Sequence, residues 1–415
     1  MALIEPLVAF AVSLVLLLLL LYKRVNVGIA LNAAALFLAF LVLEWQKIPE
    51  IIYSTAIEPL AVAVVLATFG IMLLSQLYKE TGAINSLSES AGRIIRNSKI
   101  VSSVLPAIIG LLPVAGGALM SAPLVDSQTE KLGLKPEKKA YVNIWFRHTI
   151  FPVYPLSQVL IITSALTGVA ITSIIIRQIP VVAVMVITGF LIAFWRSSSE
   201  KKRGDQSTVK ENSSRNSELK RFLIAFSPIL ATIVVVVGLG AAGVNMAGLD
   251  VFTSTVLGII VLIAIAKPSF SILAKPLRKR EIYGVTLAAY GALFLRNVAV
   301  TAGISEIVRA FAINGNIDVI VLLSVVPAAL GFVTGSPTSG VAISVPILLG
   351  MVTFSPASVA LLYISAFLGY LIVPSHLCLV FTIDYFKCSM GRVYRYILPS
   401  FFVSFIAALL VYFLV

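Results

Sequence analysis

The feature that most constrains this chain is a series of apolar segments, each about as long as a lipid bilayer is thick. A helix that crosses the hydrocarbon core needs roughly 20 mostly apolar residues. Ten segments come close to this length, and they cover residues 3–22, 25–43, 57–77, 141–165, 178–195, 222–243, 251–266, 283–300, 357–381 and 397–415. We therefore predict an all-α polytopic membrane protein with about ten transmembrane helices.

The composition excludes several other classes. Hydrophobic residues make up 59% of the chain and charged residues only 12%, which is too apolar for a soluble fold. Two cysteines in 415 residues cannot form a disulfide scaffold. No His/Cys spacing typical of a metal site occurs, and no GxxxxGK[ST] motif occurs. We expect no metal, no cofactor other than a transported or coupling Na⁺ or H⁺, and no enzyme activity.

Two further apolar stretches, residues 100–125 and 319–351, do not resemble simple spans. Each is long for one crossing, and each is interrupted by helix-breaking residues. These residues are Pro113, Gly116 and Gly117 in the first stretch and Gly331, Gly335, Pro337 and Gly340 in the second. We predict two re-entrant hairpins that enter and leave the membrane on the same side.

The distribution of basic residues indicates the orientation. The net charge of +13 would suggest nucleic acid in a soluble protein, but in a membrane protein basic residues gather in cytoplasmic loops. The first segment is followed, not preceded, by basic residues, which predicts an uncleaved helix with the N-terminus outside. With both hairpins returning, only Lys47, Arg177 and Arg309 lie in outside loops. We therefore expect both termini outside and no nucleic-acid partner.

Residues 196–221 form the one hydrophilic stretch, rich in serine and mixed charge. This composition is typical of a flexible linker, here cytoplasmic, although a regulatory or lipid-binding role is an alternative.

The segments on either side of the linker resemble each other. Three pairs of positions align at nearly one spacing: Gly70 with Gly291, Gly117 with Gly340, and Pro155 with Pro374, which are 221, 223 and 219 residues apart. Residues 1–195 and 222–415 are therefore predicted to be two repeats, each with three helices, a hairpin, a proline-broken helix and a final helix. Five crossings per repeat is an odd number, so the second repeat is expected to be inverted. Inverted repeats with broken helices are typical of secondary transporters.

This arrangement resembles the ion transporter superfamily, which includes divalent-anion/sodium symporters and citrate and gluconate permeases. The stretches GLLPVAGGALMSAPLVDSQ and RHTIFPVYPLSQ look more like a family of ten-helix prokaryotic membrane proteins of unassigned function. The resemblance implies a prokaryotic plasma membrane, an elevator-like movement and a homodimer. Sodium-coupled dicarboxylate members carry Ser-Asn-Thr at each hairpin tip, and this chain does not, so the resemblance does not carry over Na⁺ binding or dicarboxylate specificity.

Irregular backbone at membrane depth occurs where it is packed in protein or lines a watery cavity, so the hairpin tips and helix breaks are the candidate substrate site. Half-helix N-termini there favour an anion, and hydroxyls add hydrogen bonds. The candidates for binding substrate or ion are Gly116, Gly117, Ser121, Thr334, Gly335, Ser336, Thr338, Ser339, Gly340, Ser157, Gln158, Ser375 and His376. Close helix packing through small residues is the alternative role.

Four more residues could attract an anion or take part in coupling: Arg147, His148, Arg296 and Asn297. Ionisable groups within a bilayer are costly and usually functional. Snorkelling to the interface is the alternative for Arg147 and His148, and a structural charge pair is the alternative for Arg296.

We predict an ion-coupled carrier of a small organic anion, driven by H⁺ or Na⁺. A channel of the same fold is one alternative. An intramembrane serine hydrolase that pairs Ser336 or Ser339 with His376 is another.

Overall fold

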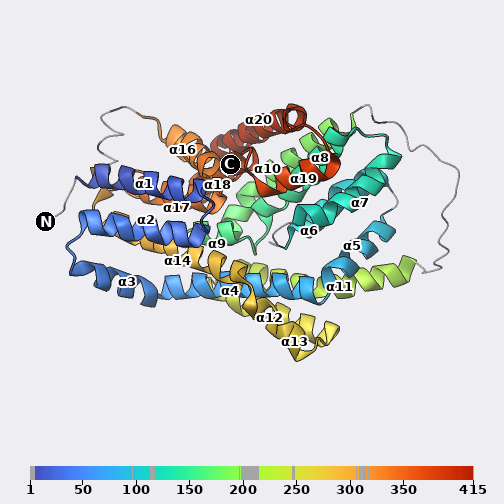
Figure 1. Cartoon of the computed structure of the whole chain (residues 1–415), viewed down its shortest axis with the longest axis horizontal. Coiled ribbons are helices and arrows are strands. Elements are labelled where there is room, and N and C mark those ends of the chain that lie inside the picture. Colours follow the sequence, from blue (N-terminus) through green and yellow to red (C-terminus); the bar gives the residue numbers. More distant parts are fainter. Residues whose placement is uncertain are drawn as a thin grey trace.

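The computed structural model describes residues 5–95, 97–112, 117–195, 197, 215–244, 248–304, 306–307, 310, 315 and 317–414. Within these ranges the chain is helical and contains no strand (Figure 1). The predicted all-α polytopic class is confirmed. Most of the predicted linker, as well as Arg309 and the first-tip residues 113–116, lies outside the described residues.

The first half of the chain forms ten α-helices and one short 3₁₀ helix. They are α1 (Pro6–Tyr22), α2 (Val27–Val42), α3 (Lys47–Ile57), α4 (Pro59–Glu80), α5 (Ala83–Ile94), α6 (Ser98–Gly110), α7 (Gly117–Lys131), α8 (Pro136–Thr149), η1 (Phe151–Val153), α9 (Gln158–Thr167) and α10 (Ile171–Phe194).

The second half repeats much of this order. Its elements are α11 (Arg215–Ala241), α12 (Leu249–Ala266), α13 (Phe270–Ala274), η2 (Pro276–Arg278), α14 (Arg280–Thr301), α16 (Val319–Thr334), α17 (Pro337–Leu348), α18 (Pro356–Leu371), α19 (Leu377–Phe386) and α20 (Met390–Leu414). Helices α4 and α14 start at residues 59 and 280, α9 and α19 at 158 and 377, and α10 and α20 at 171 and 390. The spacing of about 220 residues that the sequence suggested is thus also the spacing of the helices.

Seven helical segments are long and apolar enough to cross a membrane in the part of the chain that the structure describes. They are residues 59–80, 136–167, 171–194, 215–241, 249–266, 280–301 and 390–414. Of the other three predicted spans, α1 and α2 are helices of 17 and 16 residues, and the third is divided into α18 and α19. The sequence did not predict α3 or α5. Helix α5 buries Ile84, Leu87 and Ala91 on one face and is otherwise polar, which places it against α6 and α11.

Both predicted hairpins are pairs of short helices in contact with each other, α6 with α7 and α16 with α17. Their arms have 13, 15, 16 and 12 residues, or about 18–24 Å at 1.5 Å per residue, which is less than the hydrocarbon core of about 30 Å. The second pair turns at Gly335, which adopts a left-handed φ of 62°. Gly331 and Gly340 lie within α16 and α17, so they do not interrupt these helices as the sequence suggested.

Both predicted proline breaks are present. Helix α8 ends at Thr149, and α9 starts at Gln158 after Pro152 and Pro155. Helix α18 ends at Leu371, and α19 starts beyond Pro374. Proline lacks the amide proton that a continuous helix needs, so turns replace the helix hydrogen bonds at each break.

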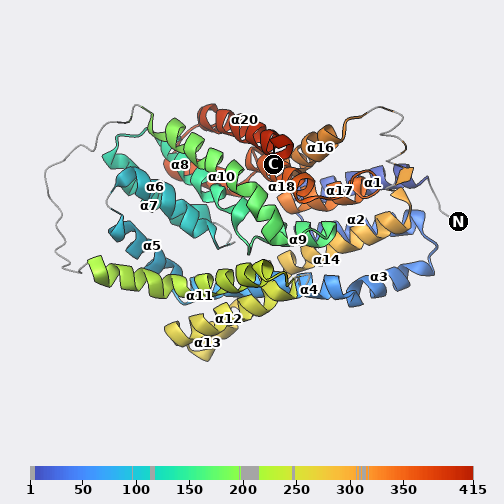
Figure 2. The same ribbon diagram turned by 180° about the vertical axis from the view of Figure 1, so that it is seen from behind.

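The two halves contact each other reciprocally. Helix α2 packs on α14 and α12 packs on α4, while α7 packs on α19 and α17 packs on α9; α4 also meets α14, and α10 meets α20. Figures 1 and 2 show α4, α11 and α12 on one side of the molecule and α16 and α20 on the other. The hairpins and broken helices therefore form one group packed against a second group built on α4 and α14.

Candidate functional site

The first candidate feature is a buried arginine near the end of α8, whose guanidinium lies against the start of α7. Arg147 lies near the end of α8, is 2% exposed and forms no ion pair with any described residue. Its Nε and Nη1 atoms have no hydrogen-bond partner among the described residues. The guanidinium lies against Gly117, the first residue of α7, so closely that a Cβ at Gly117 would collide with it. A positive side chain thus adjoins the positive end of a helix dipole without a counter-charge.

The second half has the same close packing of a hairpin glycine on a helix carbonyl, but without a charged side chain. Gly110 packs on the carbonyl of Arg147, and Gly331, which is 221 residues later, packs on the carbonyl of Ala366. A Cβ added at Gly340 would meet the Ala366 Cβ at 3.1 Å. Arg147 and Ala366 therefore occupy equivalent positions, and only the first half places a cation there.

Both histidines of the chain lie beside Arg147. His148 follows it on α8, and His376 is the N-cap of α19; their ring centroids are 4.8 Å apart in an edge-on arrangement. His148 and His376 are 2% and 3% exposed. Because His148 and Arg147 are both buried within the protein, neither side chain reaches the interface by snorkelling. The fold thus brings together some of the candidate residues that the sequence predicted around the two helix breaks.

Each histidine ring uses one nitrogen for a contact within the protein. His148 Nδ1 lies 2.7 Å from the carbonyl of Ile144. A carbonyl only accepts, so Nδ1 carries the proton, and Nε2 of the neutral ring keeps its lone pair. His376 Nε2 lies 2.7 Å from the hydroxyl of Tyr370, and its Nδ1 is buried without a partner among the described residues.

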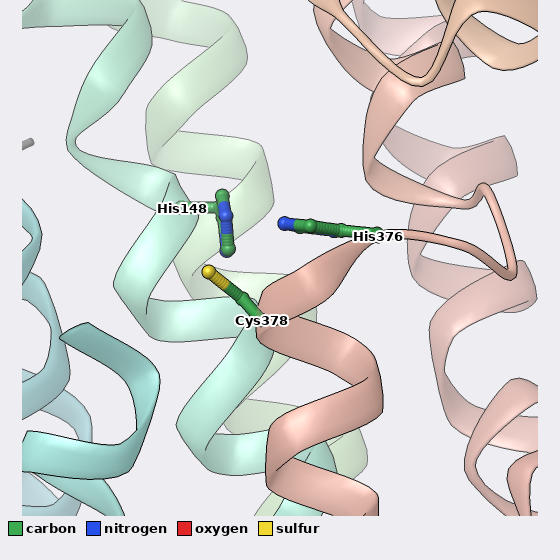
Figure 3. A group of neighbouring side chains, drawn as sticks. All are labelled: His148, His376 and Cys378. Carbon is green, nitrogen blue, oxygen red and sulfur yellow. The ribbon is translucent and has the colours of Figure 1, made fainter. Parts of the chain in front are cut away.

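Cys378 completes this group, and sequence reasoning missed it. The nearest ligand atoms of His148, His376 and Cys378 all lie within 4.8 Å of one another, and Figure 3 shows His376 and Cys378 directed toward His148. The expectation of no metal site rested on local spacing, whereas the fold joins residues 148 and 376 across the chain. The position of Cys378 two residues after His376 was the available signal.

The second hairpin tip is rich in hydroxyls, as predicted, but most of them bond locally. Thr334 donates to the carbonyls of Leu330 and Ser336. Ser336 caps α17 by accepting from the Ser339 amide at 3.2 Å. Ser339 itself is fully buried, and its hydroxyl has no partner among the described residues. Thr338 is half-buried beside it.

The remaining candidates occupy several environments. Gly335 faces exposed Ser375, because a Cβ at Gly335 would lie 3.7 Å from the Ser375 hydroxyl. Ser121 bonds back to Gly117 and Ala118 within α7. Ser157 occupies the N-cap position of α9 without a side-chain capping hydrogen bond, and the Gln158 Nε2 beside it is buried without a described partner. Gly116 lies outside the described residues.

Arg296 and Asn297 lie on α14, apart from this group. The amide of Asn297 donates to Thr55 and to Glu58, each at 3.1 Å, which ties α14 to the ends of α3 and α4. Gln76 of α4 makes the reciprocal contact, donating to Glu281 at 3.2 Å. The Arg296 Nε is buried without a described partner.

The hydrolase alternative required a serine hydroxyl bonded to His376. In the described part of the chain, the side chain of His376 bonds to Tyr370, and Ser336 bonds to the Ser339 amide. The arrangement instead offers positive charge, helix N-termini and unpaired donors, which suits an anion.

The fold, with its short helix pairs and two broken helices, is that of a polytopic α-helical membrane protein. Residues 6–415 match the model of the family described as "Protein of unknown function (DUF401)", so the chain belongs to that family. This agrees with the predicted membership of a family of unassigned function. A search of curated proteins finds no match.

Two solved transporter structures share the fold. The YdaH transporter of Alcanivorax borkumensis superimposes with a TM-score of 0.61 at 16% identity, covering 99% of this chain and 98% of that one. MtrF of Neisseria gonorrhoeae, from a class of antimetabolite efflux pumps, superimposes with a TM-score of 0.52 at 13% identity, covering 88% and 83%. At these identities the likeness establishes the fold alone. Membership of the ion transporter superfamily stays a prediction.

Proposed function

We propose that the protein is a secondary active transporter of a small organic anion, coupled to H⁺ or Na⁺. The observation that carries the proposal is Arg147, a buried guanidinium at the N-terminus of α7 with two nitrogens that no described residue hydrogen-bonds. A buried charge without a partner is costly, and an anion that binds there removes much of that cost. The transporters that share the fold support the same class of function.

The substrate would bind where the first hairpin meets both broken helices. Arg147 would form bidentate hydrogen bonds with a carboxylate, and the amides at the start of α7 would add further hydrogen bonds. Gln158 on α9 and Ser339 on the second hairpin are further candidates, because the Gln158 Nε2 and the Ser339 hydroxyl are buried without a described partner. The coupling ion would bind in the same region.

The repeated order of helices and their reciprocal contacts support alternating access between two inverted halves. In this proposal the hairpins and broken helices move together against the group built on α4 and α14. An elevator-like movement within a homodimer in a prokaryotic plasma membrane belongs to the same proposal.

The test is uptake of radiolabelled organic anions into proteoliposomes under an imposed pH or sodium gradient. We expect gradient-driven accumulation of at least one anion by the wild type. Arg147→Ala should lower its uptake by about tenfold or more, because losing one partner of a buried charge contact costs about 2–5 kcal/mol. Arg147→Lys should recover only part of it, since lysine lacks the planar fork.

The matched control is Arg392→Gln, which removes an exposed arginine of α20 and should leave uptake unchanged. The variant Arg147→Ala should fold, because Ala366 occupies the equivalent position in the second half. No gradient-driven uptake across a broad anion panel would overturn the proposal, and so would unchanged uptake by Arg147→Ala. Flux that never exceeds equilibrium would favour a channel.

A further inference from the structure

We infer that His148, His376 and Cys378 form a binding site for a thiophilic divalent metal ion of the Zn²⁺ type. The three side chains come from the end of α8 and the start of α19, and their nearest ligand atoms lie within 4.8 Å of one another (Figure 3). A tetrahedral ion with bonds of about 2.0–2.3 Å holds its ligands about 3.3–3.8 Å apart. Closing the group on an ion therefore needs side-chain movements of about 1 Å.

The hydrogen bond of His148 is of the kind that metal-binding histidines make, and His376 has one ring nitrogen in contact with a tyrosine hydroxyl. A metal-binding histidine usually donates its second nitrogen to a carbonyl or another polar group, which fixes the tautomer and the ring. His148 does so through Nδ1 to the Ile144 carbonyl, and this leaves the Nε2 lone pair for an ion. His376 is oriented by Tyr370.

An independent observation points to a missing ligand. His376 is 3% exposed, and its Nδ1 has no hydrogen-bond partner among the described residues. A buried polar atom left unpaired costs about 1–3 kcal/mol. A metal ion bound to this ring through Nδ1, with the Nε2 contact to Tyr370 retained, would replace the unpaired atom by a coordination bond.

The donor atoms select the kind of ion. Two imidazoles and a thiol favour a soft or borderline ion such as Zn²⁺ and disfavour Mg²⁺ or Ca²⁺, which prefer oxygen. As the Zn–S bond forms, the Cys378 thiol loses its proton to solvent, and the thiolate offsets part of the positive charge. Arg147 opposes any added cation, so an ion that ionises the thiol is favoured over one that does not.

The test uses the purified full-length protein and metal alone, so it is independent of transport. After treatment with a chelator, the protein is titrated with Zn²⁺, and with Co²⁺ as a spectroscopic probe of thiolate ligation. We expect about one equivalent of Zn²⁺ to bind and Co²⁺ to give a sulfur-to-metal charge-transfer band. Cys378→Ser should abolish the band and weaken Zn²⁺ binding by at least about tenfold. Even substitution of residues that only hydrogen-bond to the metal ligands costs that much.

Cys388→Ser is the matched control, because Cys388 is the other of the two cysteines and lies between α19 and α20, outside the group. It should bind Zn²⁺ and Co²⁺ like the wild type. In that protein Cys378 is the sole thiol, so bound Zn²⁺ should slow its alkylation by a maleimide, a readout that needs no change at the site itself. Absence of saturable Zn²⁺ binding, an unchanged spectrum in Cys378→Ser, or alkylation that Zn²⁺ does not slow would each overturn the inference.

Discussion

At the scale of single residues, the candidate site depends on one arginine set between two glycines. The sequence predicted that Arg147 and both histidines matter, because ionisable groups are costly in a bilayer. It could not predict that Gly117 packs on the guanidinium, or that His376 and Cys378 approach His148, since these contacts join residues far apart in the chain. The distance between such residues is set by helix packing, which no local pattern encodes.

The two glycines that contact Arg147 should respond differently to alanine. At Gly117 the added methyl would meet the guanidinium, the movable end of a side chain, so Gly117→Ala should fold but displace Arg147. We expect its KM for the transported anion to rise by about tenfold, since one good charged contact is worth about 1.5–3 kcal/mol. Uptake kinetics in proteoliposomes measure this.

Gly110→Ala is the comparison, because its methyl would meet the backbone carbonyl of Arg147, which cannot move as freely. This change should lower stability by about 1–3 kcal/mol, as overpacking usually does. A Gly117→Ala protein with wild-type KM would contradict the proposed position of the substrate.

At the scale of helices, the second hairpin is held to its neighbour by small residues. Ala328 and Gly331 of α16 face Ala366 and Gly369 of α18, and each glycine lies against the carbonyl of the opposite alanine. Without a Cβ the two backbones approach closely, which is how membrane helices gain packing energy. Gly331, which the sequence did not include among the candidate binding residues, thus has a packing role.

Replacing Gly369 by alanine should force α16 and α18 apart. The added methyl would collide with the Ala328 carbonyl, so we expect a loss of about 1–3 kcal/mol and a lower midpoint of thermal unfolding in detergent. Gly238→Ala in α11 is the control, since no atom lies within 4 Å of its added methyl and alanine favours a helix. Equal thermal midpoints for Gly369→Ala and Gly238→Ala would show that the contact is not tight.

The sequence predicted most long helices and both proline breaks, because bilayer-length apolar runs and prolines act locally. It missed α3 and α5, whose mixed composition resembles that of loops until their buried faces are known. It also assigned Gly331 and Gly340 to an interruption, whereas close packing against α18 keeps both within helices.

At the scale of the whole molecule, the open question is on which side of the membrane each loop lies. If the first hairpin returns to the side it entered from, the chain crosses the membrane once between Trp45 and Lys135. If the hairpin spans the membrane, the chain crosses it twice between these residues. Both residues are exposed, at the end of α2 and the start of α8.

We expect Trp45→Cys and Lys135→Cys to lie on opposite sides. In a protein without its native cysteines, an impermeant maleimide should label Trp45→Cys in intact cells and Lys135→Cys only after lysis. Labelling of both in intact cells, or of neither, would place them on one side and contradict the returning hairpin. The reverse pattern would keep the hairpin but invert the predicted orientation.

Several contacts between the halves come in reciprocal pairs: α2 packs on α14 as α12 packs on α4, and α7 packs on α19 as α17 packs on α9. Matched pairs of this kind are the pattern of an isologous interface, in which each contact has its reverse. A flexible linker at residues 196–221, as the sequence predicts, would tether the halves and raise the local concentration of one around the other. Covalent linkage also lets each half diverge on its own, which is how one side of a symmetric frame can carry Arg147 while the other carries Ala366.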